Sequence, residues 1–568
     1  EVTTAPDHSA DSAGKTPSLG GSRTGNIVRY LPLLAALVAG LVHLGPFWGA
    51  QLQTPPGWEF TGNLNGSPDE MQYRMLMERT QTTGPIVDNR MTSEPNAPHI
   101  AMFFYYGVGK LSGWLHARPG YVYAYLGAVL AIVLSLGLYW CAGHFLGSRY
   151  QTWWVFLSLL LGGGLGAHLM LLDDVDRLHS LTPFRRIVTE GLQNSIVFEQ
   201  YRSHYIFTTL FDTHFLFFLV VALAAIASLY LALTAFTVPR LLLAGFLFGT
   251  ATLLHIYDGV TLLFIAAGIV ALFWLRGLPV RHAVLTFALC ALLVGAAIAW
   301  QMLLYKQAGV PIPAWRAQSV YFSELALAYP LAWGLIAWGL VGYWRTAGVR
   351  ECFLLGWALG CTVLTLSGPF YPYSDRGTLT LQVPLMIVAG AIYFARHPRV
   401  NWRHALVAAA ILGATPVWQV WRIRTNMSFA AHPSGSPPAY TWMTPDHQAL
   451  VRALREHAVD EDILIVDKSR VPWRTDDLWL TSGFPGRLYA GHYALTPDYQ
   501  RKRDEVNAFF STTDPSAGVE FLRRASIRFV YVRQEADVAR FGQMPGLNPV
   551  LSNSVGALFE FTPRETEE

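Results

Sequence analysis

Long apolar runs separated by short polar connections fill the first three-quarters of the chain. A helix that crosses the hydrocarbon core of a bilayer, about 30 Å thick, needs roughly 20 mostly apolar residues. About eleven segments meet that requirement, and we predict membrane-spanning helices at 29–50, 121–146, 151–172, 213–237, 240–257, 259–275, 282–304, 323–344, 351–368, 379–395 and 404–421. The pattern therefore predicts a polytopic α-helical membrane protein whose transmembrane domain covers residues 29–425.

One further apolar segment, residues 100–115, is too short to cross and carries Lys110 in its middle. We predict that it forms a helix lying in the membrane interface. With that assignment, the connections on one side of the membrane are all basic, as the positive-inside rule requires of cytoplasmic loops. The N-terminus is then cytoplasmic, and the external side of the cell membrane holds loops 51–120 and 173–212 and the C-terminal region.

The C-terminal residues, 433–568, have the mixed polarity of a soluble domain and follow a linker rich in Pro, Gly and Ser. Helical and strand patterns alternate there, which favours an α/β fold. The predicted elements are a helix at 446–457, a strand at 463–467, a helix at 518–525 and a strand at 529–533. We therefore expect a soluble extracytoplasmic α/β domain after the last span.

Composition agrees with a membrane location. Hydrophobic residues make up 52% of the chain and charged residues only 14%, compared with about a quarter charged in soluble proteins. Residues 1–28 are predicted to be a disordered cytoplasmic tail. The four cysteines lie in apolar segments and are expected to act as small hydrophobic residues. No basic face interleaved with aromatic residues is visible, which argues against a nucleic-acid partner.

An acidic pair, Asp69 and Glu70, opens the first external loop and is followed by Tyr73. A carboxylate near the membrane surface can act as a general base towards a hydroxyl group, or bind a metal ion that neutralises a phosphate. The alternative is a helix start, with Ser67 as the cap, Pro68 at the first helical position and the two acids complementing the helix dipole.

A second acidic cluster at 173–176 contains Asp174 and Asp176 and follows the third span. Oxygen ligands of this kind suit a divalent cation, magnesium or manganese, although a solvated helix end would look the same. Further polar residues, among them His204 and the Asp212-Thr213-His214 run, lie just before the fourth span. Polar residues at that depth often line a cavity.

Two more polar groups interrupt the apolar pattern at external boundaries. His255, Tyr257 and Asp258 fall between the fifth and sixth spans. Polar side chains at this depth need partners or water. They could belong to a functional site or make a structural hydrogen bond. Arg376 lies in a Tyr- and Pro-rich boundary and could hold a phosphate with its fork of donors. Lys110 could do the same, or extend its ammonium group to the membrane surface.

These groups converge on one membrane face. A set of acids and cations above a helical bundle is what a phosphate-bearing lipid substrate requires. The residues that topology places on the external side are Asp69, Glu70, His99, Asp174, Asp176, His255 and Arg376.

In order and placement the chain resembles the GT-C superfamily of membrane glycosyltransferases, which use polyprenyl-phosphate sugars as donors. The shared features are a first span, an external loop opening with an acidic pair (Asp69-Glu70, with Tyr73 nearby), an interfacial helix after His99, and many spans with an external soluble tail. The 173–176 cluster resembles the second acidic motif of the superfamily. A Lys-Pro-Pro element that some relatives place before the interfacial helix is absent, and 96–99 reads Asn-Ala-Pro-His instead.

The resemblance implies transfer of a sugar from a polyprenyl phosphate to an acceptor hydroxyl on a glycan, lipid or protein, within the membrane lipids. Asp69 would be the general base beside Glu70, and a metal at Asp174 and Asp176 would be optional, because many members with a monophosphate donor need none. The residues expected to bind substrate are Tyr73, His99, Lys110, His204, His255, Tyr257 and Arg376. The alternatives are a transporter or flippase of a lipid-linked or anionic substrate, and a non-catalytic scaffold.

Overall fold

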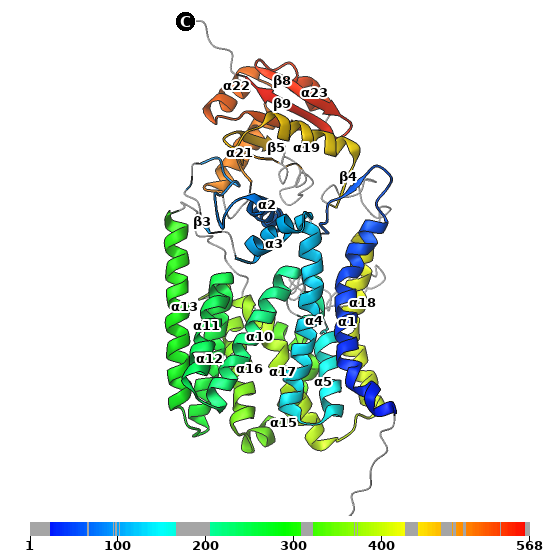
Figure 1. Cartoon of the computed structure of the whole chain (residues 1–568), viewed down its shortest axis with the longest axis vertical. Coiled ribbons are helices and arrows are strands. Elements are labelled where there is room, and N and C mark those ends of the chain that lie inside the picture. Colours follow the sequence, from blue (N-terminus) through cyan, green and yellow to red (C-terminus); the bar gives the residue numbers. More distant parts are fainter. Residues whose placement is uncertain are drawn as a thin grey trace, which may run out of the picture.

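The computed structural model divides the molecule into a long helical bundle and a smaller domain stacked on one end of it (Figure 1). It describes residues 23–64, 68–94, 96, 99–100, 103–165, 168, 205–307, 322–368, 370–371, 373–426, 441–466, 480, 484–491, 496–533 and 535–562. The predicted sites Asp174, Asp176 and His204 lie outside these residues, as does the predicted tail up to residue 22. Residues 23–28 of that tail form the start of the first helix.

A helix stands at each segment that the hydropathy pattern predicts to span the membrane. Seven of the helices in the described part of the chain are long and apolar enough to cross a bilayer. The bundle helices are α1 (Arg23–Leu52), α4 (Pro119–Leu146), α5 (Arg149–Leu161), α10 (Thr213–Thr234), α11 (Val238–Leu254), α12 (Ile256–Leu275), α13 (Arg281–Gln307), α15 (Pro330–Arg345), α16 (Val349–Leu366), α17 (Thr378–Arg396) and α18 (Trp402–Asn426). The chain is thus a multi-pass membrane protein, while the full count of eleven spans stays a prediction.

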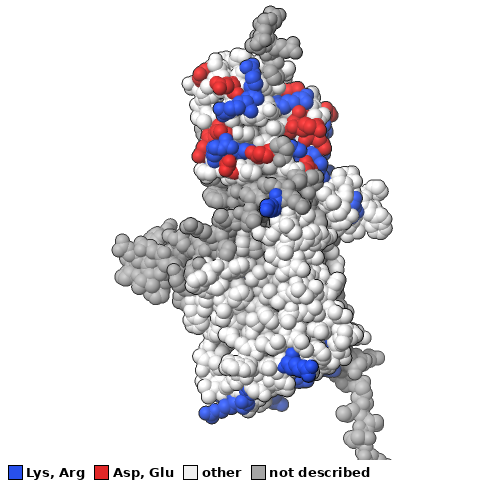
Figure 2. Space-filling view, turned by 90° about the vertical axis from the view of Figure 1, so that its left-hand side faces the viewer, with Lys and Arg blue, Asp and Glu red and all other residues white. Residues whose placement is uncertain are grey.

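The bundle presents an apolar surface outward, as lipid contact requires. Phe246 and Leu292, for example, are 65% and 67% exposed. On the face in Figure 2, charged side chains gather on the upper domain and at the lower end of the bundle, where the coloured residues are Lys or Arg. The basic connections of the sequence therefore share the end remote from the C-terminal domain, which agrees with the charge pattern behind the predicted topology.

Two helices lie across the end of the bundle that faces the C-terminal domain, α2 (Pro68–Thr82) and α3 (Phe103–Trp114) (Figure 1). With 12 residues, α3 is about 18 Å long, too short to cross a bilayer. It packs closely on α2 at Gly109, where a β-carbon would collide with Thr80 and with the carbonyl of Met77. The segment predicted to lie in the interface is therefore a short helix at the end of the bundle.

The C-terminal domain contains a five-stranded sheet in the order β6-β5-β7-β9-β8. Strands β6, β5 and β7 run parallel, and β9 and β8 are antiparallel. The strands are β5 (Ile463–Val466), β6 (Arg487–Leu488), β7 (Phe529–Val532), β8 (Leu547–Asn553) and β9 (Gly556–Phe561), and the helices are α19 (Pro445–His457), α21 (Tyr499–Ser511), α22 (Pro515–Arg524) and α23 (Glu535–Phe541). The α/β fold is as predicted, and the four predicted elements correspond to α19, β5, α22 and β7.

Alternate residues of the central strands build two cores. Ile465 and Val530 pack with side chains of α21, α22 and α23, whereas Leu464 and Phe529 pack with side chains of α19. Successive strand residues point to opposite faces, so helices cover both faces of the sheet. This explains why β5 and β7 are fully buried runs rather than alternating ones.

The C-terminal domain is joined by backbone pairing to the segment that connects α1 with α4. Strand β1 (Glu59–Phe60) pairs with β4 (Trp442–Met443), and the indole Nε1 of Trp442 donates to the carbonyl of Ala50 over 3.0 Å. Further along, the loop between β2 (Ile86–Val87) and β3 (His99–Ile100) contacts the domain, where the amide of Leu488 donates to the carbonyl of Arg90 over 2.9 Å. The loop that carries α2 is therefore fixed to the domain at both ends.

A buried lysine reinforces this attachment. The Lys502 side chain is 2% exposed, pairs with Glu94 and donates to Ser93 Oγ over 2.9 Å. Burial is the largest single influence on the pKa of Glu94 and raises it, but the hydrogen bonds from Lys502 and Thr92 and the charge of Lys502 together lower it more, so the net pKa lies below its ordinary value of 4.5. Glu94 is thus ionised at neutral pH and balances the buried charge.

Replacing Glu94 with Gln should loosen the loop from the domain, because the Lys502 charge then remains buried without its carboxylate. We expect a cost of about 1–2 kcal/mol, less than the roughly 3–5 of a fully buried pair, since Glu94 is 40% exposed. Hydrogen exchange at residues 86–94 should accelerate by about 5–30-fold. Asp498→Asn, at a 75% exposed carboxylate, is the control. Equal exchange rates in both variants would contradict the conclusion that the Lys502–Glu94 pair fixes the loop to the C-terminal domain.

Candidate active site

Polar and aromatic side chains from six elements meet at the end of the bundle beneath α2 and α3. They come from α2, α3, the start of α10, the junction of α11 and α12, and the short helix η3 (Ser374–Gly377) before α17. This is the end that faces the C-terminal domain (Figure 1). The site is built from segments that are far apart in sequence.

Three stacked rings form the centre of the cluster. Tyr73 of α2 lies over Tyr105 of α3 and His214 of α10, with centroid distances of 4.4 and 4.9 Å and nearly parallel planes. The Tyr105 hydroxyl and His214 Nδ1 are hydrogen-bonded, and both side chains are buried. Asp212 caps α10 by accepting a hydrogen bond from the amide of His214 over 3.0 Å. The cap fixes the start of the helix and therefore the backbone position of His214.

His255 continues the cluster from the junction of α11 and α12. Its backbone is extended, with φ −155° and ψ 107°, so it ends one helix and begins the next. The His255 ring stands edge-on to that of His214, with centroids 5.6 Å apart. Its Nδ1 lies 3.3 Å from Asp258 Oδ2, yet the two atoms are not aligned as a hydrogen bond and are buried without another partner among the described residues.

Helix η3 supplies the cation of the site. The Arg376 guanidinium lies over the Phe215 ring, 5.1 Å from its centroid, and its charge acts on Asp375, Asp258, Tyr73 and Tyr257. Within the described chain, Arg376 Nε is buried and has no hydrogen-bond partner. Burial without a partner is unusual for so polar an atom.

Close packing and stacking hold η3 in place. A β-carbon at Gly377 would collide with Thr365 and the Cys361 carbonyl, so only glycine allows this approach to α16. On the other side, the rings of Tyr373 and Tyr257 are stacked with centroids 3.5 Å apart. The position of Arg376 therefore follows from the contacts of its immediate neighbours.

The acidic pair lies at the start of α2, with Pro68 as the first residue of the helix. Glu70 lies within electrostatic range of Tyr105 and Tyr123. Asp69 occupies the first turn, one residue before Glu70, and its side chain lies outside the described part. The expectation of a helix start and the expectation of a site are thus compatible.

The structure brings together five of the predicted site residues, namely Glu70, Tyr73, His255, Tyr257 and Arg376. Lys110 lies apart, with its ammonium 3.5 Å from the carbonyl of Gln81 near the far end of α2. His99 is in β3, opposite Val87, and its side chain lies outside the described part.

Sequence reasoning did not select Tyr105 or assign a role to His214. The polar run at 212–214 before an apolar span was the available signal for His214. Tyr105 gave no signal, because a tyrosine in an apolar helix is common.

The described residues contain no group of three or more His, Cys, Asp or Glu side chains that could hold a metal ion. The predicted ligands Asp174 and Asp176 are not among the described residues. A magnesium or manganese site at these positions therefore stays a prediction.

The chain combines a multi-pass helical bundle with a polar site at the end beneath an α/β domain. Solved structures with a similar fold are known. No protein-family model matches the chain, and no curated protein matches its sequence. Among solved structures it is similar to the archaeal oligosaccharyltransferase AglB from Archaeoglobus fulgidus, with 12% identity over 95% of this chain and 75% of AglB, at a TM-score of 0.52.

It is also similar to the arabinofuranosyltransferase AftD from Mycobacteria, with 13% identity over 90% of this chain and a TM-score of 0.51. A variant of AftD gives a TM-score of 0.56 over 95% of this chain, again at 13% identity. The chain spans only 41–42% of AftD. These likenesses show that the chain has the GT-C fold of membrane glycosyltransferases.

The hydrogen bond between Tyr105 and His214 should couple the two side chains energetically. Either Tyr105→Phe or His214→Phe alone leaves a buried polar group unpaired, at a cost of about 1–3 kcal/mol. The double variant removes both groups and should cost about 1–2 kcal/mol less than the sum of the single variants. Unfolding of the purified protein in detergent measures this cycle. Strictly additive costs would contradict the proposed pairing.

Proposed function

We propose that the chain is a membrane glycosyltransferase that moves a sugar from a polyprenyl-phosphate donor to an acceptor hydroxyl on the extracytoplasmic face. The observation that carries the proposal is the occurrence of an acidic helix start together with a buried arginine and a buried histidine at one end of a GT-C bundle. Arg376 Nε and His255 Nδ1 are both buried there without hydrogen-bond partners in the described chain. A phosphate oxygen is the acceptor that would satisfy such donors.

The proposed reaction assigns separate tasks to the two parts of the site. Asp69 takes the proton of the acceptor hydroxyl as its oxygen attacks the anomeric carbon of the donor sugar. The bond from that carbon to the phosphate oxygen breaks, and the polyprenyl phosphate leaves with the electron pair. Arg376 and His255 stabilise the growing negative charge on the phosphate.

The remaining side chains position these groups. Tyr73 joins α2, which begins with the acidic pair, to the ring pair of Tyr105 and His214. The bundle provides lateral access for a polyprenyl chain from the membrane. A divalent cation at Asp174 and Asp176 would add charge neutralisation, and no step above depends on it.

A transporter or flippase would place its ionisable residues near the middle of the membrane. Here the described cluster gathers at one end of the bundle, beside α2 and α3 (Figure 1). That placement supports an enzyme acting at a membrane surface, and we therefore prefer the glycosyltransferase.

Asp69→Asn should reduce transfer of radiolabelled sugar from polyprenyl-phosphate donors by about 10²–10⁴-fold, the contribution expected of a general base. The assay uses purified protein in nanodiscs, with and without EDTA. Loss in the variant but not with EDTA is the expected result, and loss with EDTA would assign a role to a metal. Transfer by the variant at the wild-type rate would remove Asp69 from the mechanism.

Arg376→Gln should reduce kcat by about 10²–10³-fold, because the charge on the departing phosphate loses its buried donor. Arg118→Gln is the matched control, since Arg118 is half-exposed and pairs with Glu59 away from the cluster. Equal effects of the two substitutions would show that only general charge at this surface matters.

A further inference from the structure

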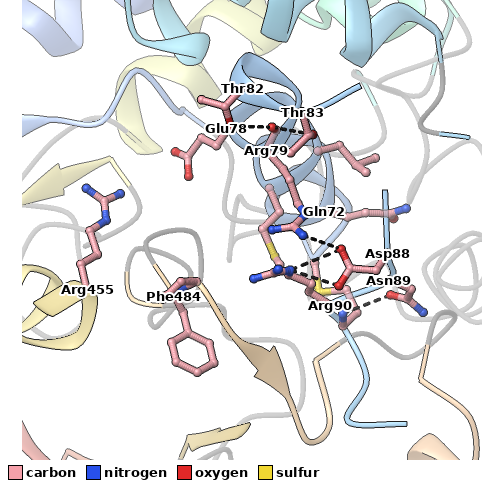
Figure 3. A pocket seen from close by; sticks show the side chains of 14 residues that line it. Gln72, Glu78, Arg79, Thr82, Thr83, Asp88, Asn89, Arg90, Arg455 and Phe484 are labelled. Atoms are coloured by element: carbon pink, nitrogen blue, oxygen red, sulfur yellow. Dashed lines mark hydrogen bonds and ion pairs between the residues drawn. The ribbon is translucent and has the colours of Figure 1, made fainter. Parts of the chain in front are cut away.

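A pocket lies on the opposite side of α2 from the ring stack, between that helix and the C-terminal domain. It has a volume of about 240 Å³, somewhat below the roughly 300–1,000 Å³ typical of pockets for drug-sized ligands. Figure 3 shows Glu78, Arg79 and Thr82 on α2, Thr83 directly after it and, across the pocket, Arg455 and Phe484 of the C-terminal domain. None of these residues belongs to the site described above.

The two faces of α2 serve different neighbours. Tyr73, Met77 and Thr80 pack towards α3 and the bundle, whereas Gln72 and Arg79 line the pocket. Helix positions three or four residues apart share a face. Position 69 lies one turn before Gln72, about 4.5 Å along the helix axis. The pocket therefore begins one turn from the proposed general base and extends away from it along α2.

Four charged side chains of the pocket, Glu78, Arg79, Asp88 and Arg90, each have a partner of opposite charge. Arg79 pairs with Asp88 over 2.9 Å, and Arg90 pairs with Asp88 over 3.3 Å and with Asp460 over 2.8 Å (Figure 3 shows the pairs with Asp88). Glu78 is paired with Arg74 over 2.9 Å. An anionic ligand would face two carboxylates and a cationic ligand three arginines, so the lining favours a ligand without net charge.

Hydrogen-bonding capacity of both kinds surrounds an apolar floor. The Thr82 and Thr83 hydroxyls and the Gln72 and Asn89 amides can each donate and accept. Apolar side chains complete the lining, namely Met75, Leu76, Met91, Phe484 and Pro485. A ring that bears hydroxyls at its edge and C–H groups on its faces matches this combination.

We propose that this pocket is an acceptor subsite that binds neutral sugar units of a glycan, at a distance from the hydroxyl that reacts. The inference rests on the proposed function, which places the reacting hydroxyl at Asp69, and it identifies the acceptor class as a neutral oligosaccharide rather than a lipid or protein. Arg79 of α2 also lies 3.7 Å from Asp460 of the C-terminal domain, so an ion pair links the two sides of the pocket.

The kinetic test compares acceptors of two and six sugar units with the full-length protein in nanodiscs. Thr82→Trp places a large side chain at the exposed rim of the pocket, and Arg455→Ala removes a lining side chain. Each should raise KM for the six-unit acceptor by about tenfold. The kcat for both acceptors and the KM for the two-unit acceptor should not change. Arg452→Ala, exposed on the same helix α19, is the control. Equal loss of kcat with both acceptors, or no change with either, would overturn the subsite.

A binding test separates this inference from the proposed function. Saturation-transfer NMR is recorded with six-unit oligosaccharides of arabinofuranose, mannopyranose, glucopyranose and galactopyranose, without any donor. Saturation in wild type that is lost in Thr82→Trp supports the pocket even if no sugar transfer is ever detected. No saturation of any of the four, equal saturation in Thr82→Trp, or saturation only of a serine- and threonine-containing peptide would overturn it.

Discussion

The structure depends on keeping a few polar side chains together at the end of an apolar bundle. Tyr105 and His214 are hydrogen-bonded in a buried position, and Tyr73 covers both rings. An unpaired polar group there would cost a substantial part of the marginal stability of a folded protein. The contact therefore joins α2, α3 and α10, and with them the acidic helix start and the cationic groups of the site.

The C-terminal domain extends this arrangement from the other side. Its contacts with the segment between α1 and α4, through β1, β4 and the buried Lys502, hold α2 between the bundle and the domain. One face of α2 consequently packs on the ring stack, while the other lines a polar pocket. In the proposed mechanism α2 thus contributes both to the site where the acceptor hydroxyl reacts and to the pocket that binds the acceptor's remaining sugar units.

Much of this organisation could be predicted from the sequence. Span length predicts the bundle, and loop charge predicts that Asp69, His255 and Arg376 lie at the same end of it. Both signals can be read from the sequence because hydrophobicity and charge are properties of individual residues. Alternating patterns likewise predict α19, β5, α22 and β7. The role of Tyr105 and the pocket beside Arg79 could not be predicted, since both arise from contacts between segments distant in sequence. The two-residue strands β1 and β4 were also missed, because so short a pattern carries no periodicity.

In the proposed mechanism, Arg376 and His255 hold the phosphate of a polyprenyl donor. Native mass spectrometry of the protein with decaprenyl phosphate and with decaprenol, for wild type and Arg376→Gln, tests it most directly. We expect wild type to bind the phosphate at least about tenfold more tightly than the alcohol, and Arg376→Gln to remove this difference. Equal binding of the two lipids by wild type, or an unchanged preference in Arg376→Gln, would contradict the account.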